Sequence, residues 1–536
     1  AFIDRSLEEY LVEFPNAAVA LGRHEFDGQL PDWSRGGITK GISTLERLHA
    51  AALAFPESEL SAQERFQRAY FASRMETELF WLRDVQRPFT NPAYYFDAGL
   101  DPSVYVTVKY APPDVRLRAF IAYARKVPDA LAHVRNNLAL PLPRTFIDYG
   151  SAGFGGFADF YRNDVPKAFA EVTDPALQSE LAAVIEPAAQ AVLALQQWLE
   201  QQRPSATEQF ALGAERFAQM LAKTESVTTP VSTLLAIGEA DLARNLSALR
   251  EACQRYLPGA SLEDCVKKLE ADKPQGGAVP GARAQLAELR QFVLDRELVT
   301  IPAPTEAHVA EAPAYRRQNS AYIEIPGPYE KNLPSTYYIS PPDPSWTAAE
   351  QAAYVPDRAS LLFTSVHEVW PGHFLQFLHS NRSAWRFGQV SVGYAFAEGW
   401  AHYAEELVVE AGIATDKPSL WIGQLLNALL RNVRLVCAIG LHTQGMSVSQ
   451  CEALFKDKAF QDAGNARQQA ARGTYDPAYL NYTMGKLLLR KLRADWRAEH
   501  PGEPDRVFHD AVLSFGGPPI PLLRSQLLQH DAGALF

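Results

Sequence analysis

Residues 364–376 read TSVHEVWPGHFLQ, and the rest of the chain is predicted to form a large helical body that buries them. This largely apolar run holds His367, Glu368 and His373 within seven residues. In the common zinc-binding helix, two histidines lie four positions apart on one face, and the glutamate after the first acts as a general base. Here the second histidine comes six positions after the first, which on a regular helix turns the two side chains about 120° apart. An unbroken helix therefore cannot direct both histidines at one metal ion.

Pro371 and Gly372 lie between the two histidines and offer a solution. Proline cannot donate the backbone hydrogen bond that a helix needs, and glycine tolerates unusual backbone angles. The pair therefore predicts a broken or bulged helix that swings His373 back toward His367. In a helix interior the two residues cost about 3 and 1 kcal/mol, a strain that suggests function. The alternative is that they simply end one helix and that the histidines are capping or core residues. This stretch alone leaves both interpretations open.

A second motif, AEGWAHYAE at residues 397–405, strengthens the metal hypothesis. On a helix, Glu398, His402 and Glu405 share one face, and three ionisable groups are costly to bury unless they are paired or bind a metal. Glu398 completes a set of two histidines and one glutamate, which is the ligand pattern of a catalytic site for one Zn²⁺ ion. Glu405 or His402 would then orient a ligand histidine by a hydrogen bond. The alternative is a solvated helix face with a local Glu–His pair.

These motifs resemble those of known peptidases. Glu398–Glu405 is similar to the Glu-Gly-Phe-Ala-x-Tyr-x-Glu segment of gluzincin aminopeptidases, in which the first glutamate binds zinc. The chain as a whole resembles an uncharacterised bacterial domain-of-unknown-function family of predicted zinc peptidases, whose two motifs match His367–Gln376 and Glu398–Glu405. The resemblance implies a mainly α fold akin to the helical oligopeptidases and carboxypeptidases, with a deep cleft. One departure is Ala438, where the family usually has an acidic residue.

The expected chemistry is hydrolysis of a peptide by a metal-activated water. Zinc lowers the pKa of a bound water to about 7. Glu368 is predicted to take the proton of that water and to deliver it to the leaving amine. The oxyanion needs a further donor, and Tyr482 is the first candidate and His442 the second, both at positions that match family motifs. Each of the two is otherwise an ordinary core residue.

Four further residues are candidates for substrate binding. Arg431 and Arg434 are predicted to hold a substrate carboxylate through paired hydrogen bonds, or else to be structural ion-pair partners. Tyr337 and Tyr338 are predicted to line the substrate edge, with core packing as the alternative.

The chain outside the motifs is predicted to be mainly helical. We expect an N-terminal helical region at 1–270 and a catalytic helical region at 271–536, intertwined as one two-lobed unit. Apolar spacing predicts a long helix at about Val231–Tyr256. Glycines and aromatic residues at Asp148–Phe157 predict a loop.

A small β ribbon is predicted near 321–340, just before the motif helix. Ala321–Ile325 and Ser335–Ser340 carry the β-branched and aromatic residues that strands favour. The edge of this ribbon could bind a peptide by strand addition, or the ribbon could simply cover the core.

Composition narrows the classes of partner. The 536 residues are 47% hydrophobic and 21% charged, which is usual for a globular protein, and the net charge is −11. An acidic chain without a long basic block is not expected to bind nucleic acid. No apolar run is long enough for a membrane span, which takes about 18 residues.

The four cysteines bear on location. Cys253 and Cys265 are 12 positions apart, and Cys437 and Cys451 are 14 apart, so each pair could close a local disulfide. The alternative is four buried thiols. Disulfides persist in oxidising compartments, so a periplasmic or secreted protein is favoured over a cytoplasmic one.

Three functions remain in contention. The first is a zinc metallopeptidase, and the second is a zinc hydrolase of non-peptide amides or esters. The third is a catalytically silent helical binding protein with a vestigial site. The sequence does not distinguish exo- from endopeptidase activity, and it does not give the oligomeric state.

Overall fold

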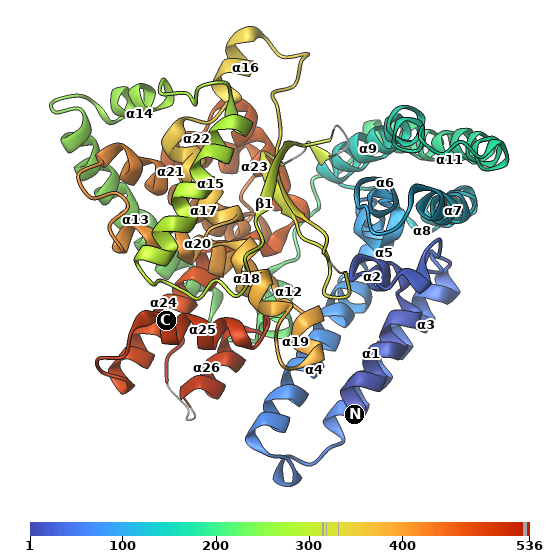
Figure 1. Ribbon diagram of the computed structural model, residues 1–536, viewed down its shortest axis with the longest axis horizontal. Coiled ribbons are helices and arrows are strands. Elements are labelled where there is room, and N and C mark those ends of the chain that lie inside the picture. Colours follow the sequence, from blue (N-terminus) through green and yellow to red (C-terminus); the bar gives the residue numbers. More distant parts are fainter. Residues whose placement is uncertain (314–315, 318, 331, 529–532) are drawn as a thin grey trace. The chain divides into compact units, whose positions relative to one another are not determined.

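The computed structural model describes residues 1–313, 316–317, 319–330, 332–528 and 533–536. The fold is mainly α, as predicted, and contains a small three-stranded sheet (Figure 1). It divides into two compact units. The first unit comprises Ala1–Phe210, Pro313–Arg316 and Pro326–Leu333, and the second unit comprises Ala211–Ala312, Arg317–Ile325 and Pro334–Phe536.

The first unit is built from helices. They are α1 (Phe2–Glu13), α2 (Pro15–Ala20), α3 (Arg35–Leu53), α4 (Ala62–Leu79), α5 (Arg87–Thr90), α6 (Ser103–Thr107), α7 (Pro113–Ala124), α8 (Val127–Asn137), α9 (Arg144–Asp159), α10 (Val165–Ala168) and α11 (Pro175–Gln201).

The second unit holds the sheet and the motif helices. Its elements are α12 (Ala214–Glu225), α13 (Val231–Tyr256), α14 (Leu262–Glu270), α15 (Ala278–Asp295), β1 (Ala307–Glu311), β2 (Ala321–Glu324), β3 (Ser335–Ile339), α16 (Ala348–Tyr354), α17 (Arg358–Glu368), α18 (His373–Ser380), α19 (Arg386–Val390), α20 (Tyr394–Glu410), α21 (Pro418–Thr443), α22 (Val448–Ala459), α23 (Ala463–Tyr475), α24 (Asn481–Glu499), α25 (Asp505–Ser514) and α26 (Ile520–Leu528).

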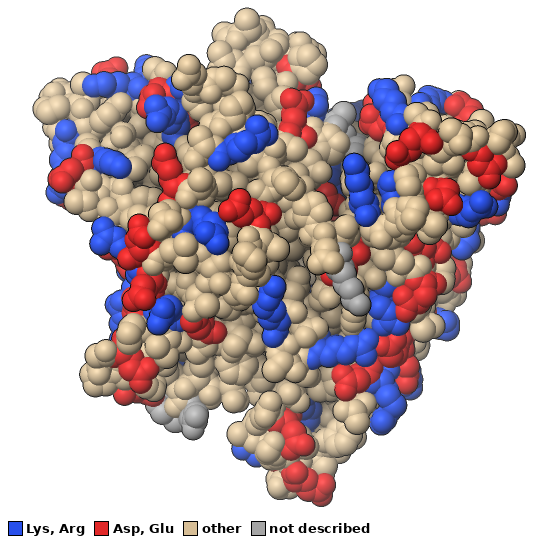
Figure 2. Space-filling view, viewed as in Figure 1, with Lys and Arg blue, Asp and Glu red and all other residues tan. Residues whose placement is uncertain are grey.

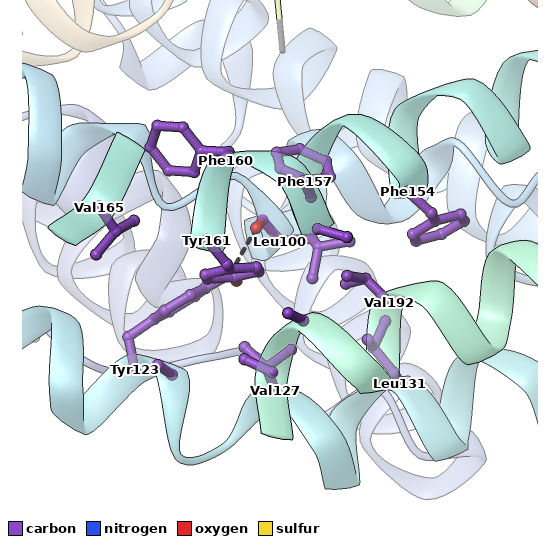
Figure 3. Packing of buried hydrophobic residues seen from close by; sticks show 14 of the residues in the cluster. Leu100, Tyr123, Val127, Leu131, Phe154, Phe157, Phe160, Tyr161, Val165 and Val192 are labelled. Carbon is purple, nitrogen blue, oxygen red and sulfur yellow. Dashed lines mark hydrogen bonds between the residues drawn. The ribbon is translucent and has the colours of Figure 1, made fainter. Parts of the chain in front are cut away.

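The core of the first unit is rich in aromatic residues, which gather between α9, α11 and the helices before them (Figure 3). Buried hydroxyl groups in this core find partners. Tyr123 donates a hydrogen bond to the carbonyl of Leu100 at 2.5 Å, and Tyr161 bonds to the Tyr123 hydroxyl at 3.4 Å. A buried phenol without a partner would cost free energy, so these bonds help to fix the packing.

The predicted loop at Asp148–Phe157 is wrong, because this segment lies inside α9. Its glycines are used for close packing. A Cβ atom on Gly153 would lie 2.2 Å from the ring of Phe96, and one on Gly150 would lie 2.9 Å from Pro92. Tertiary contacts thus outweigh the low helix propensity of glycine.

The first break between the units lies at Phe210/Ala211, whereas the sequence suggested a boundary at 270/271. The reason is packing. Helix α13, which has the predicted bounds Val231–Tyr256, packs along α21 and so belongs with the motif helices. The Pro/Gly-rich stretch just after residue 270, KPQGG at 273–277, forms a turn inside the second unit.

The sheet confirms the predicted ribbon and adds a strand. β2 and β3 pair antiparallel, with Tyr322 opposite Tyr338. β1 pairs parallel to β3 on the other side, with Val309 opposite Tyr337. A parallel partner that is distant in sequence leaves no turn signal, so local patterns do not indicate β1.

Helix α21 forms the centre of the second unit, where α13, α17 and α22 pack against it. Among the described helices it alone is long and apolar enough to cross a membrane, but 83% of its most apolar window is buried. That burial is typical of the core helix of a globular protein.

Both cysteine pairs form disulfides. Cys253–Cys265 joins α13 to α14, and Cys437–Cys451 joins α21 to α22. Each bond closes a short loop between consecutive helices: one restrains the central helix α21, and the other restrains α13, which packs against it.

A buried ion cluster ties α13, α20 and α24 together. Lys486 is fully buried, and its Nζ lies 2.7 Å from Asp241 Oδ2 and 3.1 Å from Glu406 Oε1. Asn432 of α21 donates to Asp241 at 2.8 Å. Because buried charges need partners, this cluster fixes the register of the helices behind the candidate site.

On one face of the molecule, charged residues of both signs are scattered among uncharged ones (Figure 2). On the face drawn in Figure 2, Lys and Arg side chains are interspersed with Asp and Glu. This mixture leaves no continuous basic area on that face, in keeping with the net charge of −11.

Candidate active site

The predicted break between the two histidines is confirmed. Helix α17 ends at Glu368 and α18 begins at His373. The chain crosses itself tightly here, since the Gly372 amide donates to the Val366 carbonyl at 3.0 Å. A Cβ atom on Gly372 would lie 1.8 Å from the carbonyl oxygen of His367, so only glycine fits. Trp400 of α20 secures the turn by donating Nε1–H to the Pro371 carbonyl at 2.9 Å.

The break brings three ligand atoms together. Nε2 of His367 lies 3.2 Å from Oε2 of Glu398, and Nε2 of His373 lies 3.3 Å from the same oxygen. The ligand atoms of the three residues all fall within 4.8 Å of one another. Two imidazole nitrogens and a carboxylate oxygen are the donors of many catalytic zinc sites, so the residues present fit a zinc ion.

The electrostatics of this trio favour positive charge at its centre. Burial alone would lower the pKa of His367, but hydrogen bonds with Glu398 and Glu405 raise it to about 9. Burial would raise the pKa of Glu398, yet the charge of His373 and the bond to His367 hold it well below its usual value. The carboxylates of Glu398 and Glu405 thus stabilise a positive charge on His367, and they would stabilise a bound cation in the same way.

Glu405 orients His367 from behind. Its Oε1 lies 2.7 Å from Nδ1 of His367 and 3.3 Å from Nη2 of Arg431, and its Oε2 lies 3.3 Å from Nδ1 of His402. The sequence left Glu405 and His402 as alternatives for this task, and of these two it is Glu405 that bonds to the candidate ligand His367. Arg431 is also held by Asn427 Oδ1 at 2.7 Å, so it acts as an ion-pair partner rather than a free substrate ligand.

Glu368, the candidate general base, ends α17 next to His367. It is 8% exposed, and within the described parts of the chain its carboxylate accepts no hydrogen bond. Burial raises its pKa above the ordinary glutamate value. Tyr337 of β3 is fully buried, and burial, helped by the nearby charge of Glu368, raises the pKa of its hydroxyl. These conditions suit a group that has to accept a proton near neutral pH.

Tyr482 reaches the site because two helices touch backbone to backbone. A Cβ atom on Gly399 of α20 would lie 2.6 Å from Cα of Gly485 of α24. Gly399 directly follows Glu398, and Gly485 lies about one helical turn after Tyr482. The Tyr482 ring accordingly stacks on the His367 ring, with centroids 6.0 Å apart and planes 16° apart. Burial raises the pKa of Tyr482, so the hydroxyl stays a donor.

The structure adds residues that sequence reasoning missed. Tyr394 packs edge-on against Tyr482 at 6.1 Å, and its hydroxyl lies 2.9 Å from Asp476 Oδ2 and 3.0 Å from Nη2 of Arg472. Arg472 also hydrogen-bonds to the Tyr482 side chain. Tyr394 precedes Glu398 by one helical turn, a spacing that could have indicated it.

Arg434 lies beside the same tyrosine. Its Cζ is 4.5 Å from the centroid of the Tyr482 ring, and its Nε donates to Gln469 Oε1 at 2.8 Å. Two arginines three positions apart on α21 thus have different neighbours: Arg431 pairs with Glu405, and Arg434 lies beside Tyr482.

Two candidates are placed elsewhere. Both ring nitrogens of His442 form hydrogen bonds with backbone groups. Nδ1 accepts from the Leu212 amide at 3.2 Å, and Nε2 donates to the Gly473 carbonyl at 2.7 Å. It is thus a buried structural residue and not an oxyanion donor. Tyr338 points to the opposite side of β3 from Tyr337 and stacks on Tyr322 at 5.2 Å.

Comparisons with known proteins agree on the fold. A family described as "Bacterial protein of unknown function (DUF885)" matches residues 15–527. A "putative lipoprotein of unknown function" from Shewanella oneidensis is similar in structure, with a TM-score of 0.80 and 22% identity over 98% of this chain and 99% of that one. A "putative lipoprotein" from Colwellia psychrerythraea gives 0.81 and 16% identity over 98% and 96%. No functionally curated protein matches. None of these descriptions names an activity, so the likeness to gluzincins rests on the motif residues.

Proposed function

We propose that the chain, which belongs to the DUF885 family of bacterial proteins of unknown function, is a zinc-dependent peptidase. The observation that carries the proposal is the convergence of His367 Nε2 and His373 Nε2 on one oxygen of Glu398, at 3.2 and 3.3 Å. The break at Pro371-Gly372 permits this convergence, because a regular helix through it would separate the histidines.

A bound zinc ion would supply a Lewis acid and lower the pKa of a water molecule. The protein side of the reaction falls to two residues. Glu368 takes the proton of the attacking water at its carboxylate and returns it to the nitrogen of the leaving amine. Its burial supports this role, because a raised pKa makes a carboxylate a stronger base. The Tyr482 hydroxyl, oriented by Arg472, donates to the developing oxyanion.

Metal analysis tests the site. We expect protein purified without chelators to carry or take up one zinc ion per chain. A Glu398→Ala variant should lose most of its zinc affinity, whereas Glu410→Gln, at the exposed end of the same helix, should keep it. Failure to bind stoichiometric zinc would contradict the proposal, and unchanged affinity in the Glu398 variant would remove that residue from the ligand set.

Hydrolysis tests the chemistry. We expect a mixed peptide library to be cleaved faster than simple amides and esters; the reverse order would favour the second candidate, a hydrolase of non-peptide substrates. A Glu368→Gln variant should retain zinc and lose hydrolysis by several orders of magnitude. Hydrolysis at the wild-type rate in that variant would exclude Glu368 as the base.

We further propose that the protein works outside the cytoplasm. Two disulfides support this, since such bonds are rare in reducing compartments. The relatives described as lipoproteins agree with it. Alkylation of free thiols in freshly lysed native cells is the test: the proposal requires four blocked cysteines, and four alkylated ones would contradict it.

A further inference from the structure

Three arginines lie around Tyr482 and Glu405, and they differ in how their charges are balanced. Arg431 pairs with Glu405 at 3.3 Å, and Arg472 pairs with Asp476 at 2.9 Å. Arg434 has no carboxylate within ion-pair distance in the described part of the chain.

The missing partner matters because Arg434 is buried. Arg434 is only 7% exposed. Among the described residues, its side chain makes one hydrogen bond, in which Nε donates to the neutral amide of Gln469. Both terminal nitrogens, with four N–H groups, are left for another partner. A buried charge without a counter-charge is unfavourable, and burial indeed lowers the pKa of Arg434. The cation–π contact with Tyr482 compensates only part of this cost.

Arg434 is also close to the candidate metal ligands. Its Cζ lies 4.5 Å from the Tyr482 ring, which lies 6.0 Å from the His367 ring, so the guanidinium is at most about 10.5 Å from that histidine. An extended chain spans about 3.3–3.6 Å per residue, so this upper bound limits the length of peptide between the two side chains to about three residues. Contacts at either end take up part of the distance, so at most one or two residues fit between them.

We propose that Arg434 binds the C-terminal carboxylate of a peptide substrate, so that the enzyme releases one or two residues from a free C-terminus. The planar guanidinium matches a carboxylate with two parallel hydrogen bonds, and Gln469 holds Nε so that the fork stays in place. This inference rests on the proposed peptidase function and narrows it to an exopeptidase of the carboxypeptidase class.

The kinetic test uses paired substrates with a blocked N-terminus, one with a free C-terminal carboxylate and one with a C-terminal amide. We expect kcat/KM of the wild-type enzyme to favour the acid by about 10- to 100-fold, the range for hydrogen bonds to a charged group. Arg434→Met should abolish this preference, so that the acid and the amide are hydrolysed with similar kcat/KM, and Arg434→Lys should retain part of it. Arg467→Met, which removes an exposed charge from neighbouring α23, should retain it fully.

A binding measurement separates this inference from the proposed function. Calorimetry on metal-free protein would compare N-acetylphenylalanine with its amide. Tighter binding of the acid to wild-type protein, lost in Arg434→Met, supports the carboxylate site even if no peptide is hydrolysed. Equal binding or equal hydrolysis of acid and amide by the wild-type protein overturns it, and this comparison needs no variant to fold. A preference for the acid that persists in a folded Arg434→Met variant also overturns it.

Discussion

Oε1 of Glu405 lies 2.7 Å from Nδ1 of His367, on the side of the imidazole that faces away from Glu398. The bond fixes which ring nitrogen carries the proton and leaves Nε2 to face the site. Because Glu405 is fully buried and also pairs with Arg431, its position does not depend on a ligand.

We expect Glu405→Gln to weaken zinc binding about 10- to 100-fold, the usual effect of changing the partner of a ligand histidine. Glutamine keeps an acceptor for Nδ1 but removes the negative charge that supports the imidazole. Competition with a chromogenic chelator measures the affinity. Glu410→Gln, in the same helix, is the control. An unchanged affinity in Glu405→Gln would show that Glu405 serves only the fold.

The contact between Gly399 and Gly485 predicts a second effect. A Cβ atom on Gly485 would lie 2.1 Å from the Ala395 carbonyl oxygen, so α20 and α24 would have to move apart. Gly485→Ala should therefore destabilise the protein by about 1–3 kcal/mol and lower zinc affinity, because the helix that carries Glu398 shifts. Urea unfolding and zinc titration measure the two effects.

Gly36→Ala is the matched control for that variant. It makes the same substitution in the first turn of α3, where a Cβ atom would meet, among the residues that the structure describes, only Ser34 Oγ at 3.7 Å. It should be neutral or slightly stabilising, because alanine restricts the unfolded chain. Equal stability of Gly485→Ala and Gly36→Ala would mean that the helix pair tolerates a wider spacing than the structure implies.

The convergence of the three candidate ligands could be predicted because local rules place them. Helical spacing predicts that Glu398 and Glu405 lie on the same face of their helix. Pro371-Gly372 predicts the break between the two histidines. In each case the chemistry of neighbouring residues determines the local geometry. The same holds for helix α13 and for the β2–β3 pair, whose patterns are local as well.

The rest of the site depends on which helices meet. Arg431 and Arg434 are three positions apart on α21, and the sequence treats them alike. Only the approach of Glu405 from α20 makes one of them an ion-pair partner. His442 likewise matches a family motif. Its two ring nitrogens, however, bond to the Leu212 amide and the Gly473 carbonyl, which are distant in sequence. Long-range packing has no signature in a single sequence.

The disulfide Cys253–Cys265 leads to a prediction about stability. The two cysteines are 12 positions apart, and closing a loop of this size restricts the unfolded chain by about 3 kcal/mol. Replacing both cysteines by serine should lower the free energy of unfolding by about 3 kcal/mol. Zinc affinity should stay unchanged, because α13 and α14, which carry the two cysteines, hold none of the candidate ligands. Chemical denaturation of oxidised wild type and the double variant measures the difference. Identical midpoints would show that the bond does not stabilise the fold.

Glu225, at the end of α12, should make stability depend on pH. Its Oε1 accepts from Asn481 Nδ2 at 2.7 Å and from the Ala395 amide at 3.4 Å, whereas Oε2 has no partner among the described residues. Burial raises its pKa from 4.5 to about 8. The folded protein therefore keeps a proton that the unfolded chain has already lost. Stability from this group is complete below about pH 4.5 and declines as the pH rises to about 8, by up to about 1.4 kcal/mol per pH unit.

Glu225→Gln imitates the protonated carboxyl and should remove that decline. We expect the variant to gain stability relative to wild type as the pH is raised from 5 to 8, with the two nearly equal at pH 5. Glu215→Gln, an exposed change in the same helix, should leave the wild-type pH profile intact. Urea denaturation at each pH gives the difference directly. A constant difference across this range would mean that Glu225 is ionised in the folded protein, and a cation or an ordered water at Oε2 would then have to stabilise its charge.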